Sequence, residues 1–194
     1  MLDRHLTRLR LSAEYFGFVC DLDNIRHKMS QYKQQIYDII KIKLLLSADG
    51  RLDISAETLS ENSAVLRIAV SDVAVDSSDV LRYHKTTRRD LFDKARAERP
   101  ECDELLFLNE RGELTEGSYH NLVVKLDGRM LTPPLGSGLL PGVLREELLL
   151  RGEISERVLL PTDLILADEL WLINSVRGWR RCVMVTNRDR SCQN

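Results

Sequence analysis

The sequence has little that would mark a disulfide-rich, metal-binding or membrane-spanning protein. Only four cysteines occur in 194 residues, and no two show the Cys-x-x-Cys spacing of a zinc or redox site. The four histidines show no His-x-x-x-His pattern. No apolar run approaches the roughly 18 residues that a membrane span needs, and the first residues lack the apolar block of a secretory signal. These absences predict a cytoplasmic protein with reduced cysteines, no metal site and no membrane partner.

The charge is nearly balanced, with 28 Lys and Arg against 30 Asp and Glu and a formal net charge of -2. This balance argues against bulk electrostatic binding to nucleic acid. Hydrophobic residues make up 43% of the chain, enough for a packed core in one domain or two small ones.

Hydrophobic spacing predicts a mixture of helices and strands in the first part of the chain. Apolar residues between Leu2 and Phe16 recur on one helical face. The segment Tyr37–Leu46 is short, β-branched and apolar, and Asp49-Gly50 turns it into a partner strand at Arg51–Ser55. A further strand is expected at Val65–Val75.

The stretch Asp76–Asp79 is small and polar and is typical of a linker. We therefore predict a domain boundary there, with a small N-terminal domain over residues 1–76 and a second domain over 77–194. Beyond the boundary we expect a helix capped by Thr86 or Thr87 and ending near Glu98, a second helix at Val143–Leu150, and strands at Glu104–Leu108, Asn121–Leu126, Arg157–Leu160, Glu169–Ile173 and Cys182–Val185. Frequent hairpin turns favour the α+β class.

Six short motifs follow one another in the chain. They are Arg4-His-Leu-Thr-Arg8, His84-Lys-Thr-Thr87, Thr115-Glu-Gly-Ser-Tyr-His-Asn121, Thr132-Pro-Pro134, Gly138-Leu-Leu-Pro-Gly142 and Asn174-Ser-Val-Arg-Gly-Trp179. In this order and spacing the set resembles the fold-type-IV pyridoxal-phosphate enzymes, also called class IV aminotransferases. The residues of these motifs are most similar to those of 4-amino-4-deoxychorismate lyase, in particular of the lyase-like module fused to para-aminobenzoate synthase component I.

The resemblance implies roles for an amine and an acid. Lys85 would be the catalytic residue, because it would hold pyridoxal 5'-phosphate as a Schiff base and later move protons. Glu116 would lie against the pyridine nitrogen and keep the ring protonated. Asn121, at the end of the same motif, would belong to the cofactor site.

The phosphate of the cofactor needs positive charge and backbone N–H donors. The resemblance gives it Arg8, which could otherwise be an ordinary helix-surface arginine. It also gives it the helix start formed by Gly142, Val143 and Leu144, although many family members have a threonine where Leu144 stands. Ser175 and Val176 match the second phosphate loop, where Val176 can offer only its N–H.

Basic residues should face the two carboxylates of the lyase substrate. Lys43, on the expected strand, and Arg177 are the candidates, and either could instead be a solvated residue. Relatives begin earlier with another strand, so the resemblance predicts a small domain that lacks its first strand.

The resemblance implies a lyase that converts 4-amino-4-deoxychorismate to 4-aminobenzoate and pyruvate in folate biosynthesis, and it implies a homodimer, since relatives are dimers. A class IV aminotransferase of branched-chain or D-amino acids is the alternative. A third possibility is a truncated protein that binds pyridoxal phosphate without turnover.

Overall fold

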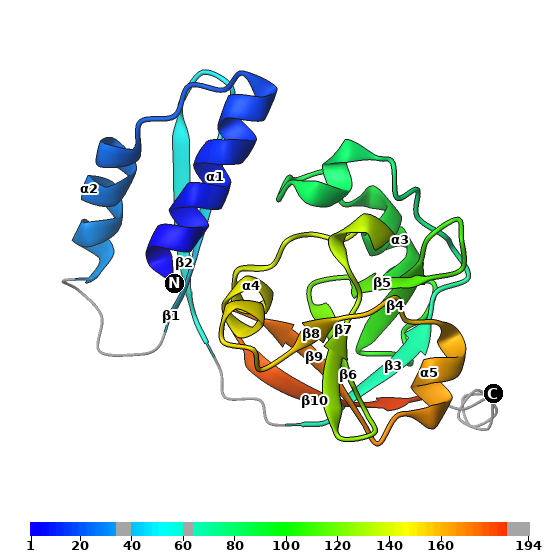
Figure 1. The fold of residues 1–194 in the computed structure, drawn as a ribbon. Helices are drawn as coiled ribbons and strands as arrows, with labels where there is room; N and C mark the ends of the chain where they lie inside the picture. The colour runs from blue at the N-terminus through cyan, green and yellow to red at the C-terminus, as the bar shows by residue number, and fades with distance from the viewer. Residues whose placement is uncertain (34–39, 60–63, 186–194) are drawn as a thin grey trace. The chain divides into compact units, whose positions relative to one another are not determined.

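The computed structural model describes residues 1–33, 40–59 and 64–185. The chain divides into two compact units, Met1–Asn62 and Ser63–Asn194. Each unit has its own secondary structure (Figure 1) and is described by itself.

The described residues of the first unit form two helices and a β-hairpin. The helices are α1 (Leu2–Phe16) and α2 (Leu22–Lys33), and the strands are β1 (Ile40–Leu46) and β2 (Leu52–Thr58). Helix α1 ends because Gly17 adopts a left-handed conformation at φ 70°, which glycine tolerates without a Cβ clash. The predicted strand begins earlier, at Tyr37, and its residues 37–39 lie outside the described ones.

The second unit is built on an eight-stranded sheet in the order β5-β4-β3-β10-β9-β6-β7-β8, in which β5 also pairs with β6. The sheet therefore curls back on itself, as Figure 1 shows. Its strands are β3 (Leu66–Val70), β4 (Glu104–Leu108), β5 (Leu114–Gly117), β6 (Asn121–Leu126), β7 (Arg129–Thr132), β8 (Ser155–Glu156), β9 (Glu169–Asn174) and β10 (Gly178–Met184). Its helical segments are η1 (Val80–Tyr83), α3 (Asp90–Ala97), η2 (Leu135–Ser137), α4 (Val143–Leu150) and α5 (Pro161–Leu166).

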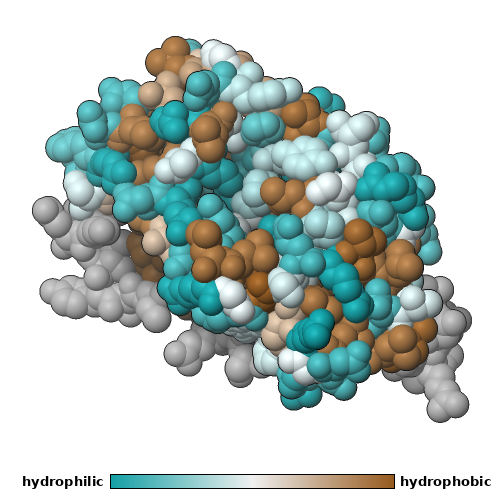
Figure 2. Space-filling model, in the orientation of Figure 1, coloured by the Kyte–Doolittle hydropathy of each residue, from teal (hydrophilic) through white to brown (hydrophobic). Residues whose placement is uncertain are grey.

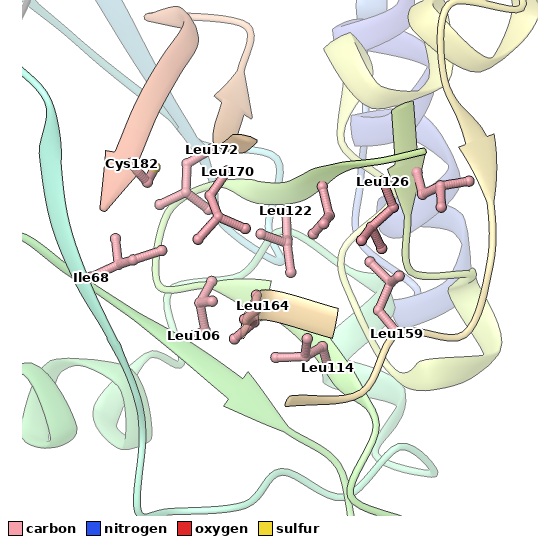
Figure 3. Close-up of a cluster of buried hydrophobic side chains, with 12 residues drawn as sticks. Ile68, Leu106, Leu114, Leu122, Leu126, Leu159, Leu164, Leu170, Leu172 and Cys182 are labelled. Carbon is pink, nitrogen blue, oxygen red and sulfur yellow. The ribbon is translucent and has the colours of Figure 1, made fainter. Parts of the chain in front are cut away.

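Two adjacent strands of this sheet, β6 and β9, are buried on both faces. Leu122 and Leu172 belong to the cluster drawn in Figure 3. The next residues along each strand, Val123 and Ile173, point to the opposite face and pack with Leu144 of α4. Burial on both faces explains why these strands are almost continuously apolar. Packing on both faces also holds β6 and β9, and therefore the residues at their ends, in place within the sheet.

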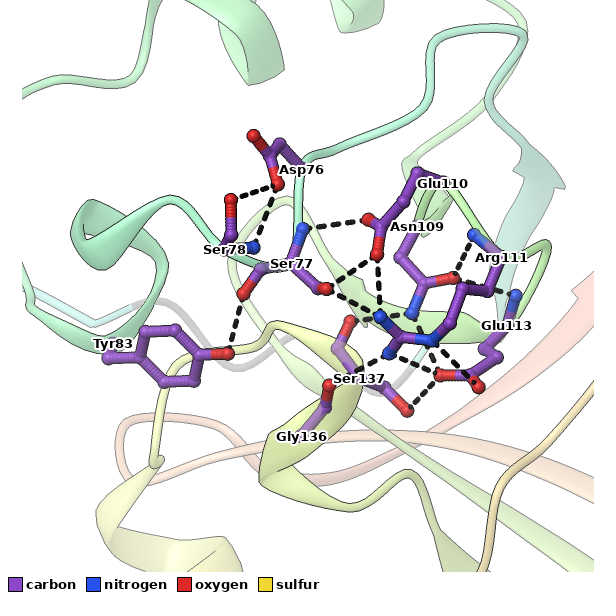
Figure 4. Close-up of polar contacts among 10 residues, drawn as sticks. All are labelled: Asp76, Ser77, Ser78, Tyr83, Asn109, Glu110, Arg111, Glu113, Gly136 and Ser137. Atoms are coloured by element: carbon purple, nitrogen blue, oxygen red, sulfur yellow. Dashed lines mark hydrogen bonds and ion pairs between the residues drawn. The ribbon is translucent and has the colours of Figure 1, made fainter.

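The division between the units differs from the predicted boundary at residues 76 and 77. Strand β3 belongs to the second unit, because it pairs in parallel with both β4 and β10. The predicted linker is also anchored there (Figure 4), since the Ser77 N–H donates to Glu110 Oε2 at 2.8 Å and the Tyr83 hydroxyl donates to the Ser77 carbonyl at 2.7 Å. Its small polar residues serve these contacts.

Several predicted elements agree with the structure and others shift. Strands β4 and β6 and helix α4 have the predicted bounds. The helix expected from Thr86 or Thr87 begins at Asp90, and the strand expected at Arg157–Leu160 is replaced by the two residues of β8. The reason for the latter is local, because Pro161 starts α5 and the Leu160 N–H donates to Asp163 Oδ2 at the start of that helix.

Hydrophilic and hydrophobic side chains are interspersed on the face shown in Figure 2. The exposed apolar residues around α5 include Leu160, Ile165 and Leu166. Within residues 1–33, 40–59 and 64–185, no helix combines the length and the hydrophobicity needed to cross a membrane.

Candidate functional site

The β5–β6 hairpin positions two of the predicted cofactor residues opposite each other. Glu116, in β5, pairs in antiparallel register with Asn121, the first residue of β6. The hairpin closes through the Gly117 N–H, which donates to the His120 carbonyl at 2.8 Å. Both side chains are buried, with 8% of Glu116 and 5% of Asn121 exposed. The motif Thr115–Asn121 is therefore a tight hairpin that presents an acid and an amide together.

The backbone of Leu140 is held by these two side chains. Its N–H donates to the Glu116 carboxylate, and its carbonyl accepts from Asn121 Nδ2 at 2.9 Å. Two residues further on, a Cβ on Gly142 would overlap Asn121 Oδ1. Glycine is therefore required where the loop passes the hairpin and enters α4.

Glu116 also faces a buried arginine that the sequence analysis did not single out. Arg82 Nη2 donates to Glu116 Oε1 at 3.2 Å. Burial nevertheless raises the pKa of Glu116 to about 7, because the cost of desolvating its charge exceeds the lowering by Arg82, by the Leu140 N–H, and by the charges of Lys85 and Arg89. The site thus contains a carboxyl group that titrates near neutral pH.

Lys85 lies three residues after Arg82, just beyond η1, and its side chain is exposed. It is close enough to Glu116 for its charge to lower the pKa of that carboxyl. The structure therefore places the predicted amine and the predicted acid in one neighbourhood, although they are far apart in the sequence.

Helix α4 begins directly after the glycine that passes Asn121. Gly142 is its N-cap, and Val143 and Leu144 form its first turn. The N–H groups of a first helical turn have no partner within the helix and carry partial positive charge. The side chain of Leu144 packs in the core with Val123 and Ile173, so this residue contributes packing where a threonine would add a hydroxyl.

The turn between β9 and β10 differs from the prediction in one respect. Asn174 Oδ1 accepts the N–H of Val176 at 2.9 Å and the N–H of Arg177 at 2.8 Å. The Val176 N–H, expected to be offered to the phosphate, is therefore already used inside the turn. Asn174 Nδ2 donates to the Tyr119 carbonyl at 3.3 Å, so the turn that carries Ser175 is tied to the β5–β6 hairpin.

Two predicted residues lie in the first unit. Arg8 is half-buried on α1, and Lys43 is exposed on β1 opposite Ser55. Glu116, Asn121 and Gly142 are in contact within the second unit, with Lys85 near them and the turn of Ser175–Arg177 tied to the same hairpin.

The sequence analysis missed Arg82 and Asn174. Asn174 could have been found from the Asn-Ser-Val-Arg string, because asparagine side chains commonly accept N–H groups two residues on. Arg82 gave no comparable signal except its place in the apolar string Val80–Tyr83.

The chain is similar to known proteins of one family. The family model described as amino-transferase class IV matches residues 1–185. The "probable branched-chain-amino-acid aminotransferase" of Thermotoga maritima is 27% identical over 187 residues, which covers 90% of this chain and 68% of the relative. The "putative aminodeoxychorismate lyase" of Schizosaccharomyces pombe is 25% identical over 204 residues, which covers 100% of this chain and 87% of the relative.

Among solved structures, the "putative amino-acid aminotransferase" of Mesorhizobium loti superposes with a TM-score of 0.90 at 37% identity, covering 95% of this chain and 91% of that one. The expected fold class, a fold-type-IV arrangement with a small and a larger α/β unit, is confirmed by these matches. Because the family model extends over nearly the whole chain, this chain belongs to the class IV aminotransferase family.

Proposed function

We propose that this chain is a pyridoxal-phosphate enzyme that cleaves 4-amino-4-deoxychorismate to 4-aminobenzoate and pyruvate. The observation that carries the proposal is the buried carboxyl of Glu116, with a pKa raised to about 7 and within electrostatic reach of Lys85. The cofactor is pyridoxal 5'-phosphate, which, when bound, draws electron density from the substrate carbon attached to nitrogen.

The residues present fit this cofactor by their chemistry. An amine, an acid and the first turn of a helix are the three groups that its aldehyde, ring nitrogen and phosphate require. Lys85 supplies the first, Glu116 the second and the Gly142–Leu144 helix start the third. A positive ring nitrogen beside Glu116 would add a cation, and so would favour the ionised carboxylate.

Each residue then has a defined task. Lys85 would bind the cofactor covalently and, once released, would remove the proton from the substrate carbon that bears nitrogen. Glu116 would hold a proton at the ring nitrogen. Asn121 would fix the Leu140 backbone, and through it the start of α4. Ser175 would add a hydroxyl donor for the phosphate.

We extend the proposal to residues of the first unit and of the β9–β10 turn. Arg8 would bind the phosphate, and Lys43 and Arg177 would bind substrate carboxylates. An Arg8→Gln variant should then bind the cofactor more weakly, and Lys43→Gln and Arg177→Gln variants should raise KM with little change in kcat, because they remove ground-state binding. Homodimer formation and a cytoplasmic location stay predictions, and sedimentation of the purified protein would measure the first.

Lysine labelling tests the covalent role of Lys85. The protein loaded with cofactor should gain a visible absorbance band, and borohydride reduction followed by peptide mapping should label Lys85. A Lys85→Ala variant should lose the band. Lys94, an exposed lysine on α3, supplies the matched control, and a band that survives in Lys85→Ala but disappears in Lys94→Ala would refute the assignment.

Transamination of amino acids is the second candidate, and the 37% identity to the Mesorhizobium loti protein favours it. One fold can support several reactions, so the residues of the substrate pocket, and not the fold, determine which reaction a class IV enzyme catalyses. Two coupled assays separate the reactions: pyruvate release from 4-amino-4-deoxychorismate, and keto-acid formation from L- or D-amino acids. Cofactor uptake with neither product would instead identify a binding protein without turnover.

A further inference from the structure

Three arginines alternate with two aromatic rings beside Glu116. The Arg82 guanidinium carbon lies 4.7 Å from the centre of the Phe92 ring, and that of Arg89 lies 5.2 Å from the same ring. Arg89 also lies 4.2 Å from the centre of the Tyr119 ring, and Arg96 lies 5.1 Å from it. We refer to these five residues as the arginine–aromatic stack, in which each ring face attracts the guanidinium groups next to it.

The inner end of the stack touches the acid of the candidate site. Arg82 is 8% exposed and uses two of its nitrogens for separate acceptors. Its Nε donates to the Gly138 carbonyl at 3.2 Å, and its Nη2 donates to Glu116 Oε1 at 3.2 Å. The planar guanidinium therefore connects the η2 loop to Glu116, a bridge that a single ammonium group could not form in the same geometry.

The middle of the stack supports the same hairpin from another side. Arg89 Nη2 donates to the carbonyl of Ser118, which lies in the turn between Glu116 and Asn121. Arg89 Nε and Ser118 Oγ are buried and have no hydrogen-bond partner among the residues that the structure describes. The stack thus reaches Glu116 through Arg82 and the hairpin turn through Arg89.

We propose that Arg82 is a positioning residue for Glu116: its guanidinium is the permanent counter-charge that favours the ionised form of the buried carboxyl group, and its second hydrogen bond holds that group at a fixed place relative to the η2 loop. The role rests on the proposed function only in that Glu116 acts on the cofactor. The charge and the bridge themselves belong to the protein without cofactor.

The other cations that face Glu116 cannot take this role. Lys85 is exposed, so water screens its charge, and its amine is committed to the cofactor when one is bound. Arg89 is directed to the Ser118 carbonyl and to the two rings. Arg82 makes the ion pair with Glu116, and a guanidinium stays protonated at every pH at which the protein folds.

The experiment follows the ionisation of Glu116 in the full chain without cofactor. Carboxyl carbons of labelled glutamate are observed by NMR as a function of pH, and the Glu116 signal is identified by its loss in Glu116→Gln. Arg82→Gln should raise the pKa of Glu116 by about 1 or more, since a partner charge at this distance lowers an acid by about 1 to 3. Arg96→Gln, at the outer end of the same stack, should leave the Glu116 signal unchanged.

A second variant separates charge from bridging and covers the case in which Arg82→Gln does not fold. Arg82→Lys keeps a positive charge, so the pKa of Glu116 should stay close to the wild-type value. Its single nitrogen cannot replace the two separate donor atoms, Nε and Nη2, with which Arg82 bridges Gly138 and Glu116, so amide hydrogen exchange in Leu135–Leu140 should become several-fold faster. A Glu116 signal that titrates as in wild type in Arg82→Gln, or wild-type exchange of this loop in Arg82→Lys, would overturn the proposal. Cofactor uptake, measured in parallel, tests the proposed function separately.

Discussion

Three glutamates on the β4–β5 hairpin, each paired with an arginine, differ sharply in ionisation. Glu110 and Glu113 lie in the turn, where hydrogen bonds lower the pKa of each to about 2, from the Ser77 N–H and hydroxyl for Glu110 and mainly from Arg111 for Glu113. Glu116 lies only three residues further along, opposite Arg82, and its pKa is raised to about 7. An arginine partner alone therefore does not decide the ionisation of an acid.

Burial decides it. The outer set, drawn in Figure 4, joins the buried Ser77 and Ser137 to Glu110, Arg111 and Glu113, and hydrogen bonds to the two carboxylates outweigh the small cost of desolvating them. The inner set, formed by Arg82, Glu116, Asn121 and Leu140, excludes water from the carboxylate. Both sets hold the same loop of residues 133–140, but only the inner one contains a group that can exchange a proton near pH 7.

The largest expected effect comes from removing the inner acid. Glu116→Gln should lower kcat of the cofactor-loaded protein by about 100-fold or more, because a positioned proton-holding group contributes about 100- to 10,000-fold. Glu110→Gln, an outer acid with the same substitution, should keep wild-type kcat. Steady-state kinetics of the two variants make the comparison, and equal rates would show that the difference in burial has no catalytic meaning.

The pH dependence of stability should have opposite signs for the two sets. Glu116 has a folded-state pKa of about 7 against an ordinary value of 4.5, so the folded protein binds its proton more tightly and loses stability as pH rises from 4.5 to 7. This loss amounts to about 3 kcal/mol. Urea unfolding at several pH values should show a flatter profile for Glu116→Gln across that window.

The outer acids act below that window. Because the pKa of each is about 2 in the folded protein, the ionised carboxylates stabilise the fold above pH 4.5. This stabilisation is lost as pH falls toward 2. Glu110→Gln should therefore flatten the profile only below pH 4.5. A change above pH 5 in that variant would mean that the two sets are electrically coupled.

Close packing is the next difference to test. Gly142→Ala should destabilise the protein by about 1 to 3 kcal/mol, because the added Cβ overlaps Asn121 Oδ1 and has to displace the hairpin or the helix start. The Gly136 carbonyl accepts a hydrogen bond from Arg111 of the outer set, and a Cβ added at Gly136 would point into open space. Gly136→Ala should therefore stay within about 1 kcal/mol of wild type. Thermal unfolding of both variants would decide whether the inner contacts are the tighter ones.

The sequence predicted those parts of the fold that local pattern specifies. The bounds of β4, β6 and α4 agree with the structure, because each is an apolar segment between strong turn or start residues. Strand β5 was not predicted, since its four residues, Leu114–Gly117, are too few to show a period. The predicted boundary at Asp76–Asp79 lies inside the second unit. The local sequence could not show this, because Ser77 is anchored by Glu110, which lies 33 positions later.

The same distinction applies to the site. Glu116, Asn121 and Gly142 could be predicted because they lie in recognisable motifs, and the structure brings them into contact. The role of Arg82 could not be found in this way, because its acceptors are Glu116 and Gly138, which are 34 and 56 residues away along the chain. The packing of η1 and the η2 loop against the β5–β6 hairpin decides which buried charges face each other, and the local sequence does not specify it.

The smallest expected effect concerns the centre of the outer set. Arg111 donates to Ser77 Oγ at 2.7 Å, to Glu113 Oε2 at 2.8 Å and to the Gly136 carbonyl at 2.9 Å. Arg111→Gln should nevertheless cost only about 1 kcal/mol, because nearly half of the side chain is exposed and water replaces the lost bonds. Urea unfolding against Arg129→Gln, an exposed arginine on β7, measures this cost. If Arg111→Gln also shifted the Glu116 titration, the outer contacts would influence the ionisation of Glu116 through the loop that both sets hold. An unchanged titration would mean that Arg82, and not Arg111, is the arginine that influences it.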